Sequence, residues 1–256
     1  MIDKPQPRHK SIVALALTSA AGCTDIVGYL SLYHTFTAHM TGNSVHLGNY
    51  LFDRNFEEAK LAGTVLIAFI CGSLLGRGLI EMAARKKIRS VATWTLAIEA
   101  ALLAIVATNF FHLSLDARDL LQYQTPLALM AAAMGMQTAT ITRVGPLTVH
   151  TTFVTGMINK LGQLISQALF DTYDVAVATP GSGERSVLHR KQTLLKAMFM
   201  FSIWCAYVAG AVAGTWLHVR WQLRALYAPV GLLCGAIAAD QIFPLSIEEE
   251  KDQAER

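Results

Sequence analysis

The sequence has few charged residues, since Asp, Glu, Lys and Arg make up only 15% of 256 residues while hydrophobic residues make up 53%. A soluble domain of this length could not hide so much apolar sequence in one core. The chain is therefore predicted to be a multi-pass membrane protein, covered by the lipid bilayer. Its net charge of +3 is small, and the basic residues lie beside the apolar stretches, which argues against nucleic acid as a partner.

Cysteine is also scarce, with only four residues in the chain. All four fall inside apolar stretches and none has CxxC spacing, so neither a disulfide framework nor a metal site is predicted. The sequence also lacks a GxSxG elbow, an HExxH motif, a P-loop and a dinucleotide fingerprint. We therefore expect no enzymatic activity and no cofactor.

Six stretches are long and apolar enough to span a bilayer, because a spanning helix needs about 20 mainly apolar residues. They cover residues 11–33, 61–80, 91–110, 125–143, 194–218 and 223–241. Two further segments, 38–52 and 149–170, mix polar with apolar residues, and the first is short for a span. The sequence predicts an all-α polytopic membrane bundle of about six spanning helices plus two short broken or re-entrant helices. Because 149–170 is long enough to span, eight spans are the alternative.

Glycines recur in the same order in both halves of the chain: one alone, one after a threonine, then a GxxxG pair. They are Gly22, Gly42, Gly72 and Gly76 in the first half, and Gly135, Gly156, Gly210 and Gly214 in the second. A GxxxG pair lets two helix backbones approach closely in lipid. These echoes predict a single membrane domain with internal repeats over 11–110 and 125–241. A polar loop over 171–193 lengthens the second repeat.

Basic residues help to choose between the topologies, because Lys and Arg accumulate in short cytoplasmic loops. With six spans and a cytoplasmic N-terminus, the basic cluster at 85–89 lies in the cytoplasm. If 38–52 spanned, this cluster would lie outside, against the rule. Three spans per repeat invert the second half relative to the first, as in many transporters with sites at the repeat interface. We expect the bacterial inner membrane, with both termini cytoplasmic.

Four motifs carry a resemblance to a known family: AGCTD at 21–25, MTGN at 40–43, GMQ at 135–137 and TTFVTG at 151–156. In these motifs, and over nearly the whole chain, the sequence resembles the YoaK-like family of bacterial membrane proteins of unknown function. It departs from the pattern at Met157, where the first repeat has Asn43, and at Thr138, where many relatives show Asn or Ser. The resemblance implies membrane placement and supplies no substrate.

Asp25 is the first candidate for chemistry, because an ionised carboxylate inside an apolar helix costs on the order of several kcal/mol unless it is paired or hydrated. A protonatable Asp25 near His39 or His46 could couple proton movement to a solute. In the structural alternative, Asp25 pairs with Lys160 or hydrogen-bonds a helix end. Glu99 has no counterpart in the second half, and it can simply be protonated or face a neighbour.

The Thr-Gly pairs suit helix breaks, where freed backbone groups or a bound solute find partners. The predicted substrate site combines the polar residues of both halves. They are Asp25, His39, Thr41, Gly42, Asn43, His46, Thr155, Gly156 and Asn159. His34, His39 and His46 could line a path, but His39 and His46 are about 10 Å apart along a helix, too far to chelate one metal. In the alternative, these glycines permit packing and the threonines bond back to the preceding turn.

The leading functional hypothesis is a transporter of a small solute or ion, which could be coupled to protons. The alternative is a non-transporting membrane protein that binds a lipid or a partner protein in assembly or regulation. The polar residues of segments 38–52 and 149–170 would then hold helices together. A homo-oligomer could form through the Gly72/Gly76 and Gly210/Gly214 faces. A third hypothesis, an intramembrane enzyme, would need a nucleophile and a base that converge from different helices.

Overall fold

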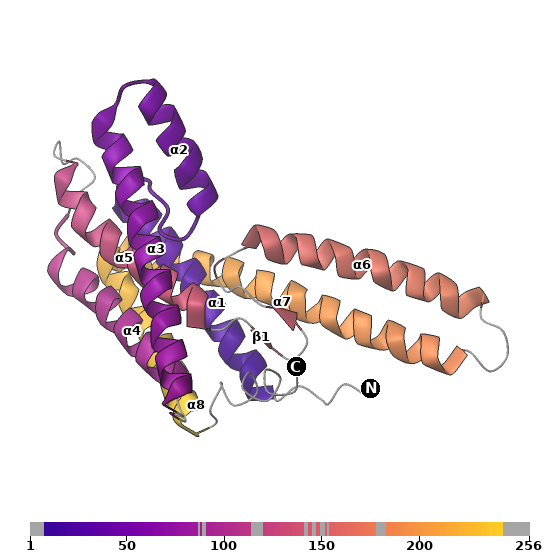
Figure 1. The fold of residues 1–256 in the computed structure, drawn as a ribbon. Coiled ribbons are helices and arrows are strands. Elements are labelled where there is room, and N and C mark those ends of the chain that lie inside the picture. The colour runs from indigo at the N-terminus through magenta and orange to yellow at the C-terminus, as the bar shows by residue number, and fades with distance from the viewer. Residues whose placement is uncertain are drawn as a thin grey trace.

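The computed structural model describes residues 8–86, 88, 91–113, 120–140, 143–144, 147–148, 152, 154–177 and 183–242, and helices dominate it (Figure 1). The elements are α1 (Arg8–Ser31), α2 (Met40–Phe52), α3 (Phe56–Arg85), α4 (Val91–Asn109), α5 (Leu121–Thr140), β1 (Arg143–Val144), β2 (Leu147–Thr148), α6 (Val154–Val177), α7 (Gly183–Trp221), the 3₁₀ helix η1 (Gln222–Leu226) and α8 (Tyr227–Ile242). Lys87 and Arg89 of the basic cluster, and Thr151 and Phe153 of the fourth motif, lie outside the described residues.

Four helical segments in the described residues are long and apolar enough to cross a membrane: His9–Ser31, Phe56–Arg85, Ala92–Asn109 and Val187–Ile242. The last segment covers α7, η1 and α8. These lengths confirm a polytopic helical membrane bundle and do not fix the number of crossings. The predicted short segment 38–52 forms a helix of 13 residues, α2.

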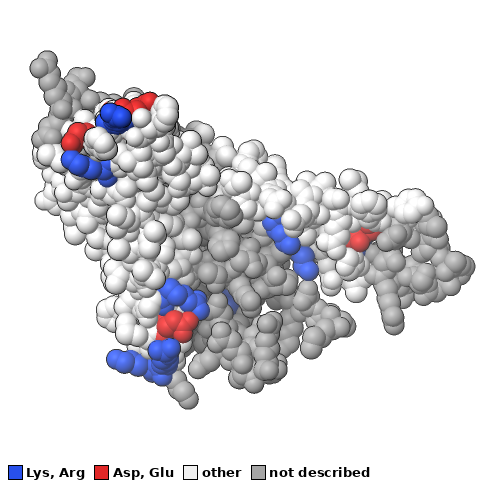
Figure 2. Space-filling model, turned by 45° about the horizontal axis from the view of Figure 1, so that its top comes forward, with Lys and Arg blue, Asp and Glu red and all other residues white. Residues whose placement is uncertain are grey.

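Charged side chains lie toward the ends of α3. Glu57 pairs with Lys60 in its first turns, and Arg77 pairs with Glu81 near its other end. The uncharged stretch 61–76 between them rises about 24 Å, close to the hydrocarbon thickness of about 30 Å. Figure 2 shows the charges on this face of the bundle in separate groups with uncharged surface between them, as expected for a helix that crosses a bilayer.

The predicted polar loop over 171–193 is wrong in extent. Residues 171–177 complete α6, and α7 begins at Gly183, so only 178–182 lies outside the described residues. The Asp171 carboxylate and the His189 ring, 3.0 Å apart, join the two helices near this end. Figure 1 shows α6 and the first part of α7 as an arm that projects from the bundle. At 39 residues, α7 is about 58 Å long, so the polar sequence from Gly183 onward belongs to a helix.

Glycines bring the two halves of the chain into backbone contact. A Cβ atom at Gly72 would overlap the Ala132 carbonyl of α5, and one at Gly210 would overlap the Ser19 carbonyl of α1. Gly76 faces Met136 of α5, and Gly214 faces Cys23 of α1. The close approach predicted for these glycines is therefore confirmed. Their partners in this structure are helices of the same chain.

These contacts are reciprocal. Gly22 of α1 lies on the backbone of Tyr207 and Ala211 in α7, whereas Gly135 of α5 lies on the backbone of Phe69 and Ser73 in α3. In each case the third helix of one half packs on the first helix of the other half. The Ser73 hydroxyl also donates to the Gly135 carbonyl at 3.2 Å.

The same contacts fix the helix directions. Residue numbers rise together along the contacts between α3 and α5 and between α7 and α1, so each pair is parallel. The helices α1 and α5 are antiparallel, because Gln137 near the end of α5 bonds to Leu17 in the first half of α1. The Tyr123 ring at the start of α5 lies 6.1 Å from the Tyr33 ring just beyond the end of α1. It follows that α1 and α3 run in opposite directions.

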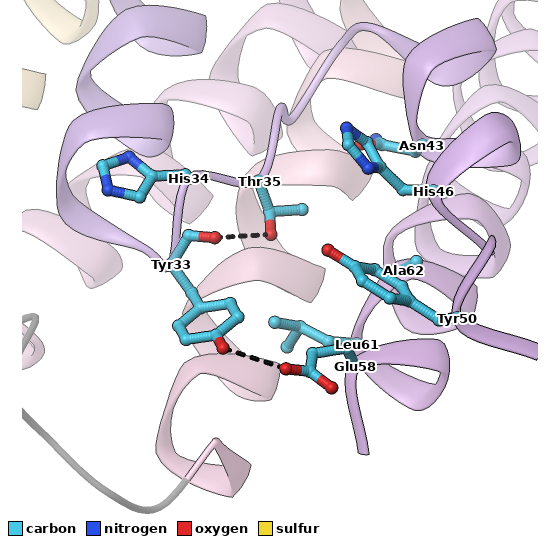
Figure 3. A pocket seen from close by; sticks show the side chains of 9 residues that line it. All are labelled: Tyr33, His34, Thr35, Asn43, His46, Tyr50, Glu58, Leu61 and Ala62. Carbon is cyan, nitrogen blue, oxygen red and sulfur yellow. Dashed lines mark hydrogen bonds between the residues drawn. The ribbon is translucent and has the colours of Figure 1, made fainter. Parts of the chain in front are cut away.

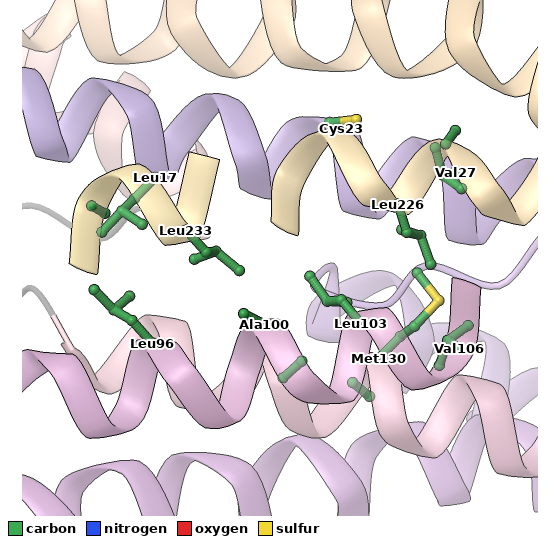
Figure 4. Close-up of a cluster of buried hydrophobic side chains, with 14 of the residues drawn as sticks. Leu17, Cys23, Val27, Leu96, Ala100, Leu103, Val106, Met130, Leu226 and Leu233 are labelled. Carbon is green, nitrogen blue, oxygen red and sulfur yellow. The ribbon is translucent and has the colours of Figure 1, made fainter. Parts of the chain in front are cut away.

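An apolar core joins α1 to α4, α5, η1 and α8 (Figure 4). Leu17, Cys23 and Val27 line the α1 side of this core, and the side chains of Leu96 and Leu103 on α4 point toward it. Such close packing supplies dispersion contacts. These contacts stabilise helix association in lipid, where the hydrophobic effect does not drive helices together.

A glycine pair on α3 tests the helix contacts. We expect Gly72→Ala to destabilise the protein by about 1–3 kcal/mol, because its methyl group would overlap the Ala132 backbone. The matched control is Gly78→Ala on the same helix, where a Cβ atom meets nothing within 4 Å. The control should be neutral or gain up to about 1 kcal/mol of helix propensity. Melting temperatures in detergent check this, and equal shifts for both variants would contradict the packing.

Candidate functional site

Asp25 lies on α1 with only 4% of its surface exposed, and it accepts hydrogen bonds at both carboxylate oxygens. Its Oδ1 accepts the Thr37 N–H at 2.8 Å, the Thr37 hydroxyl at 3.1 Å and the Ala38 N–H at 2.9 Å. Its Oδ2 accepts the hydroxyl of Tyr207 on α7 at 3.0 Å. None of the ion pairs in the described part of the chain includes Asp25, so the expected pairing with Lys160 is not formed.

Asp25 holds the loop that returns from α1 to α2. Tyr33 and His34, with φ of 53° and 49°, turn the chain back after α1 ends. The returning Thr37 then passes so close to α1 that a Cβ atom at Gly28 would lie 2.7 Å from its methyl group. The buried Asn43 side chain of α2 donates to the Phe36 carbonyl at 2.8 Å. Together, Asp25 and Asn43 fix residues 36–38 from two sides.

The second half makes the corresponding link without a carboxylate. The hydroxyls of Thr138 on α5 and Thr152, just before α6, lie 2.5 Å apart. Thr138 follows Gly135 at the interval by which Asp25 follows Gly22, and Thr152 precedes Gly156 as Ala38 precedes Gly42. The acidic group therefore exists in only one half of a paired arrangement.

Both links adjoin one small apolar cluster of buried residues. Ala21 of α1, Ala38 of the loop and Met134 of α5 form it, and the rings of Phe69 and Tyr207 pack against it. The backbone before α2 therefore reaches the helix that carries Thr138 one turn further on. Two of these residues, Ala21 and Met134, directly precede Gly22 and Gly135, so the two halves meet beside these glycines.

A small hollow opens between the loop after α1, α2 and the start of α3 (Figure 3). It is lined by Tyr33, His34, Thr35, Asn43, His46, Tyr50, Glu58, Leu61 and Ala62. Its cavity volume is about 10 Å³, room for about one water molecule. The Tyr33 hydroxyl donates to Glu58 Oε1 at 3.0 Å, and this bond raises the pKa of Tyr33. Tyr33 therefore stays a neutral hydrogen-bond donor.

The predicted histidines are divided by the fold. His34 and His46 line the same hollow, although the His34 ring lies beside Tyr29, 5.1 Å between centroids. His39 is exposed, and its ring lies over Gly42 and beside Phe36. No hydrogen bond joins Asp25 to a histidine within the described residues, so a direct proton relay between them is not present.

The other predicted site residues lie on the surfaces of α2 and of α6, which at 24 residues is longer than the short helix predicted for the second half. Thr41 is exposed on α2, and Thr155 and Asn159 are exposed on α6, while Gly42 and Gly156 are partly covered. Asp25 and Asn43 are thus the predicted residues that the structure joins through one loop. The remaining assignments stay predictions.

A bundle of apolar helices that buries a carboxylate between α1, α7 and a returning loop defines an integral membrane protein with a buried acidic residue. The family model described as "Protein of unknown function (DUF1275)" matches residues 13–239, so the chain belongs to this family. It is 34% identical over 163 residues to the UPF0700 transmembrane protein YoaK of Bacillus subtilis (strain 168), covering 64% of this chain and 69% of the relative. No solved structure matches.

Variants of Asp25 separate its hydrogen bonds from its charge. Asp25→Ala leaves buried donors of Thr37, Ala38 and Tyr207 without an acceptor, and we expect a loss of at least about 2 kcal/mol of unfolding free energy. Asp25→Asn keeps an Oδ1 acceptor and should lose less than half as much. Denaturant unfolding in bicelles measures both, together with amide hydrogen exchange at Thr37 and Ala38.

The matched control for this comparison is Asp53→Ala, which removes an exposed carboxylate that accepts from Asn49. We expect its unfolding free energy to stay within about 0.5 kcal/mol of the wild type. If Asp25→Ala lost no more stability than Asp53→Ala, Asp25 would not hold the loop at Thr37 and Ala38 as described.

Proposed function

We propose that this protein transports a small solute or ion, and that Asp25 is the proton-accepting group of its central site. The observation that carries the proposal is a buried carboxylate that meets four neutral donors and no cation among the described residues. Ionisable groups inside membrane helices are expensive, and they commonly mark substrate paths and proton relays. Of the functions considered for a buried acid in a membrane helix, transport coupled to protons uses its chemistry most directly.

The helix directions support a six-crossing arrangement. Since α1 and α3 run in opposite directions, both can span only if α2 returns to the side where it began. The helices α5 and α7 are likewise opposite, because each is parallel to one member of the first pair, so α6 would not cross either. The reciprocal glycine contacts support two internal repeats with inverted orientation. Transporters of this plan place their sites where the repeats meet.

The hydrogen bonds around Asp25 also indicate where a proton would bind. Oδ1 accepts from two backbone N–H groups, which cannot reverse and become acceptors. Oδ2 has the Tyr207 hydroxyl as its partner, and a hydroxyl can accept as well as donate. A proton on Oδ2 would therefore reverse one bond without breaking the others. Loss of the negative charge would weaken the grip on Thr37 and Ala38, because bonds to ionised acceptors are the stronger ones.

The loop is also the connection to the hollow. Asn43 lines the hollow and donates to the Phe36 carbonyl, and Thr37 and Ala38, which follow Phe36, donate to Asp25. A change in the protonation of Asp25 would act on this loop, and the loop separates the hollow from Asp25. We propose that a solute enters from the hollow, beside His46 and Glu58.

The rival proposal is a membrane protein that binds a lipid or a partner protein and transports nothing. The observation in its favour is that both oxygens of Asp25 have hydrogen-bond partners, so the residue could serve only to hold the loop and α7 in place. The two proposals differ in what Asp25→Asn does, because that variant keeps the Oδ1 acceptor for Thr37 and Ala38 and removes the proton-binding carboxylate.

Purified protein in proteoliposomes tests the proposal. We would add a panel of amino acids, carboxylates, nucleobases and inorganic ions, and record currents on a solid-supported membrane together with an enclosed pH dye. We expect the wild type to respond to at least one solute, and Asp25→Asn to reduce that response by about tenfold or more, corresponding to the loss of a charge-assisted bond. Asp53→Ala should respond as the wild type does. An equal response from Asp25→Asn would overturn the site, and a wild type that moves neither solute nor protons would favour the rival.

A further inference from the structure

Glu99 of α4 is a second buried carboxyl, and its surroundings differ from those of Asp25. It is 0% exposed, and neither of its oxygens has a hydrogen-bond partner within the described residues. The Gln137 side chain of α5 is also buried, and its Oε1 is likewise without a partner. Three acceptor oxygens therefore lie in the apolar bundle with no donor.

Two contacts place Glu99 and Gln137 at the same depth. The Thr140 hydroxyl of α5 donates to the Thr95 hydroxyl of α4 at 3.0 Å. Met130 in the middle of α5 lies beside Leu103 and Val106 of α4 (Figure 4), so the two helices are antiparallel. Glu99 therefore lies one turn beyond Thr95, and Gln137 lies about one turn before Thr140, on the same level. Gln137 Nε2 also donates to the Leu17 carbonyl at 2.6 Å, and Leu17 shares a core with Leu96, less than one turn from Glu99.

The charged and titratable side chains on neighbouring elements are engaged elsewhere. On α8, which packs against α4, Asp240 accepts from Thr93 at the start of α4. On η1, Arg224 lies over the Phe111 ring beyond the end of α4. On α3, Arg77 pairs with Glu81. Further titratable groups on the packed helices are Cys71 of α3, Tyr123 of α5, and Tyr227 and Cys234 of α8. None of the groups named here donates to Glu99.

We propose that Glu99 is a proton-binding site, with Gln137 Oε1 as the acceptor of the carboxylic hydroxyl. A proton supplies the donor that the three oxygens lack, and it needs no cavity. An ionised Glu99 without partners would be strongly disfavoured, as charges inside a membrane are. This inference deepens the proposed function and rests on it for the use of the proton, because a second buried acid extends the path from Asp25 through the bundle.

Infrared difference spectroscopy of the full-length protein in lipid tests the site without any transport measurement. The wild-type spectrum minus that of Glu99→Gln should contain, at neutral pH, one carbonyl band of a protonated carboxylic acid. Transfer to D₂O should shift this band within hours, because a proton-binding site must exchange its proton. Glu81→Gln, an exposed and ion-paired glutamate on α3, is the control and should produce no such band.

Three results would overturn the assignment. The absence of the band would mean that Glu99 is ionised, and a band that never shifts in D₂O would mean a sealed structural acid. A band left unchanged by Gln137→Leu would contradict the pairing with Gln137, since loss of the acceptor should shift it. Melting temperatures show that each variant is folded. Because the proteoliposome assay reports on Asp25, failure of the Glu99 band and failure of transport are separate outcomes.

Discussion

Backbone contact between the two halves is the constraint on which this structure depends. The helix α3 of the first half lies on α5, and α7 of the second half lies on α1, with glycines at each crossing where a methyl group would overlap a carbonyl. In lipid, helices associate through such close packing, because lipid tails are as apolar as the helices and the hydrophobic effect therefore does not drive association. Each half therefore completes the other. Asp25 lies on α1 next to one of these crossings, and this position brings Tyr207 of α7 within hydrogen-bond distance.

The two crossings differ in chemistry although they share geometry. On one side a carboxylate holds the loop before α2, and on the other side two threonine hydroxyls hold the segment before α6. An uncharged link can serve architecture alone. The carboxylate adds a group that can bind a proton, with one oxygen committed to backbone donors and the other facing a hydroxyl that can reverse its bond. This difference between the halves is the physical basis of the proposed function.

The bundle itself could be predicted from the sequence, because hydropathy and glycine spacing report directly on lipid exposure and close packing. Each of the six apolar stretches overlaps a helix, and the GxxxG glycines lie at helix crossings as expected. The extent of α7 could not be predicted, since its first turns are polar and hydropathy does not detect a helix made of polar residues. The partners of Asp25 were also missed. Two are backbone N–H groups, which carry no residue signature, and Tyr207 is distant in the chain, although it precedes the GxxxG pair of α7 as Phe69 precedes that of α3.

The central claim is that α2 does not cross the membrane, so that the two halves are inverted around Asp25. Thiol labelling tests it most directly, with single cysteines at Asn55, before α3, and at Lys86, after it, in a chain whose four native cysteines are replaced. In intact cells, we expect a membrane-impermeant reagent to label Asn55→Cys alone, and Lys86→Cys to be labelled only after the cells are opened. With the N-terminus in the cytoplasm, as the basic residues predict, labelling of Lys86→Cys alone in intact cells would mean that α2 crosses the membrane. In that case α1 and α3 would not span in opposite directions, and the inverted arrangement would be wrong.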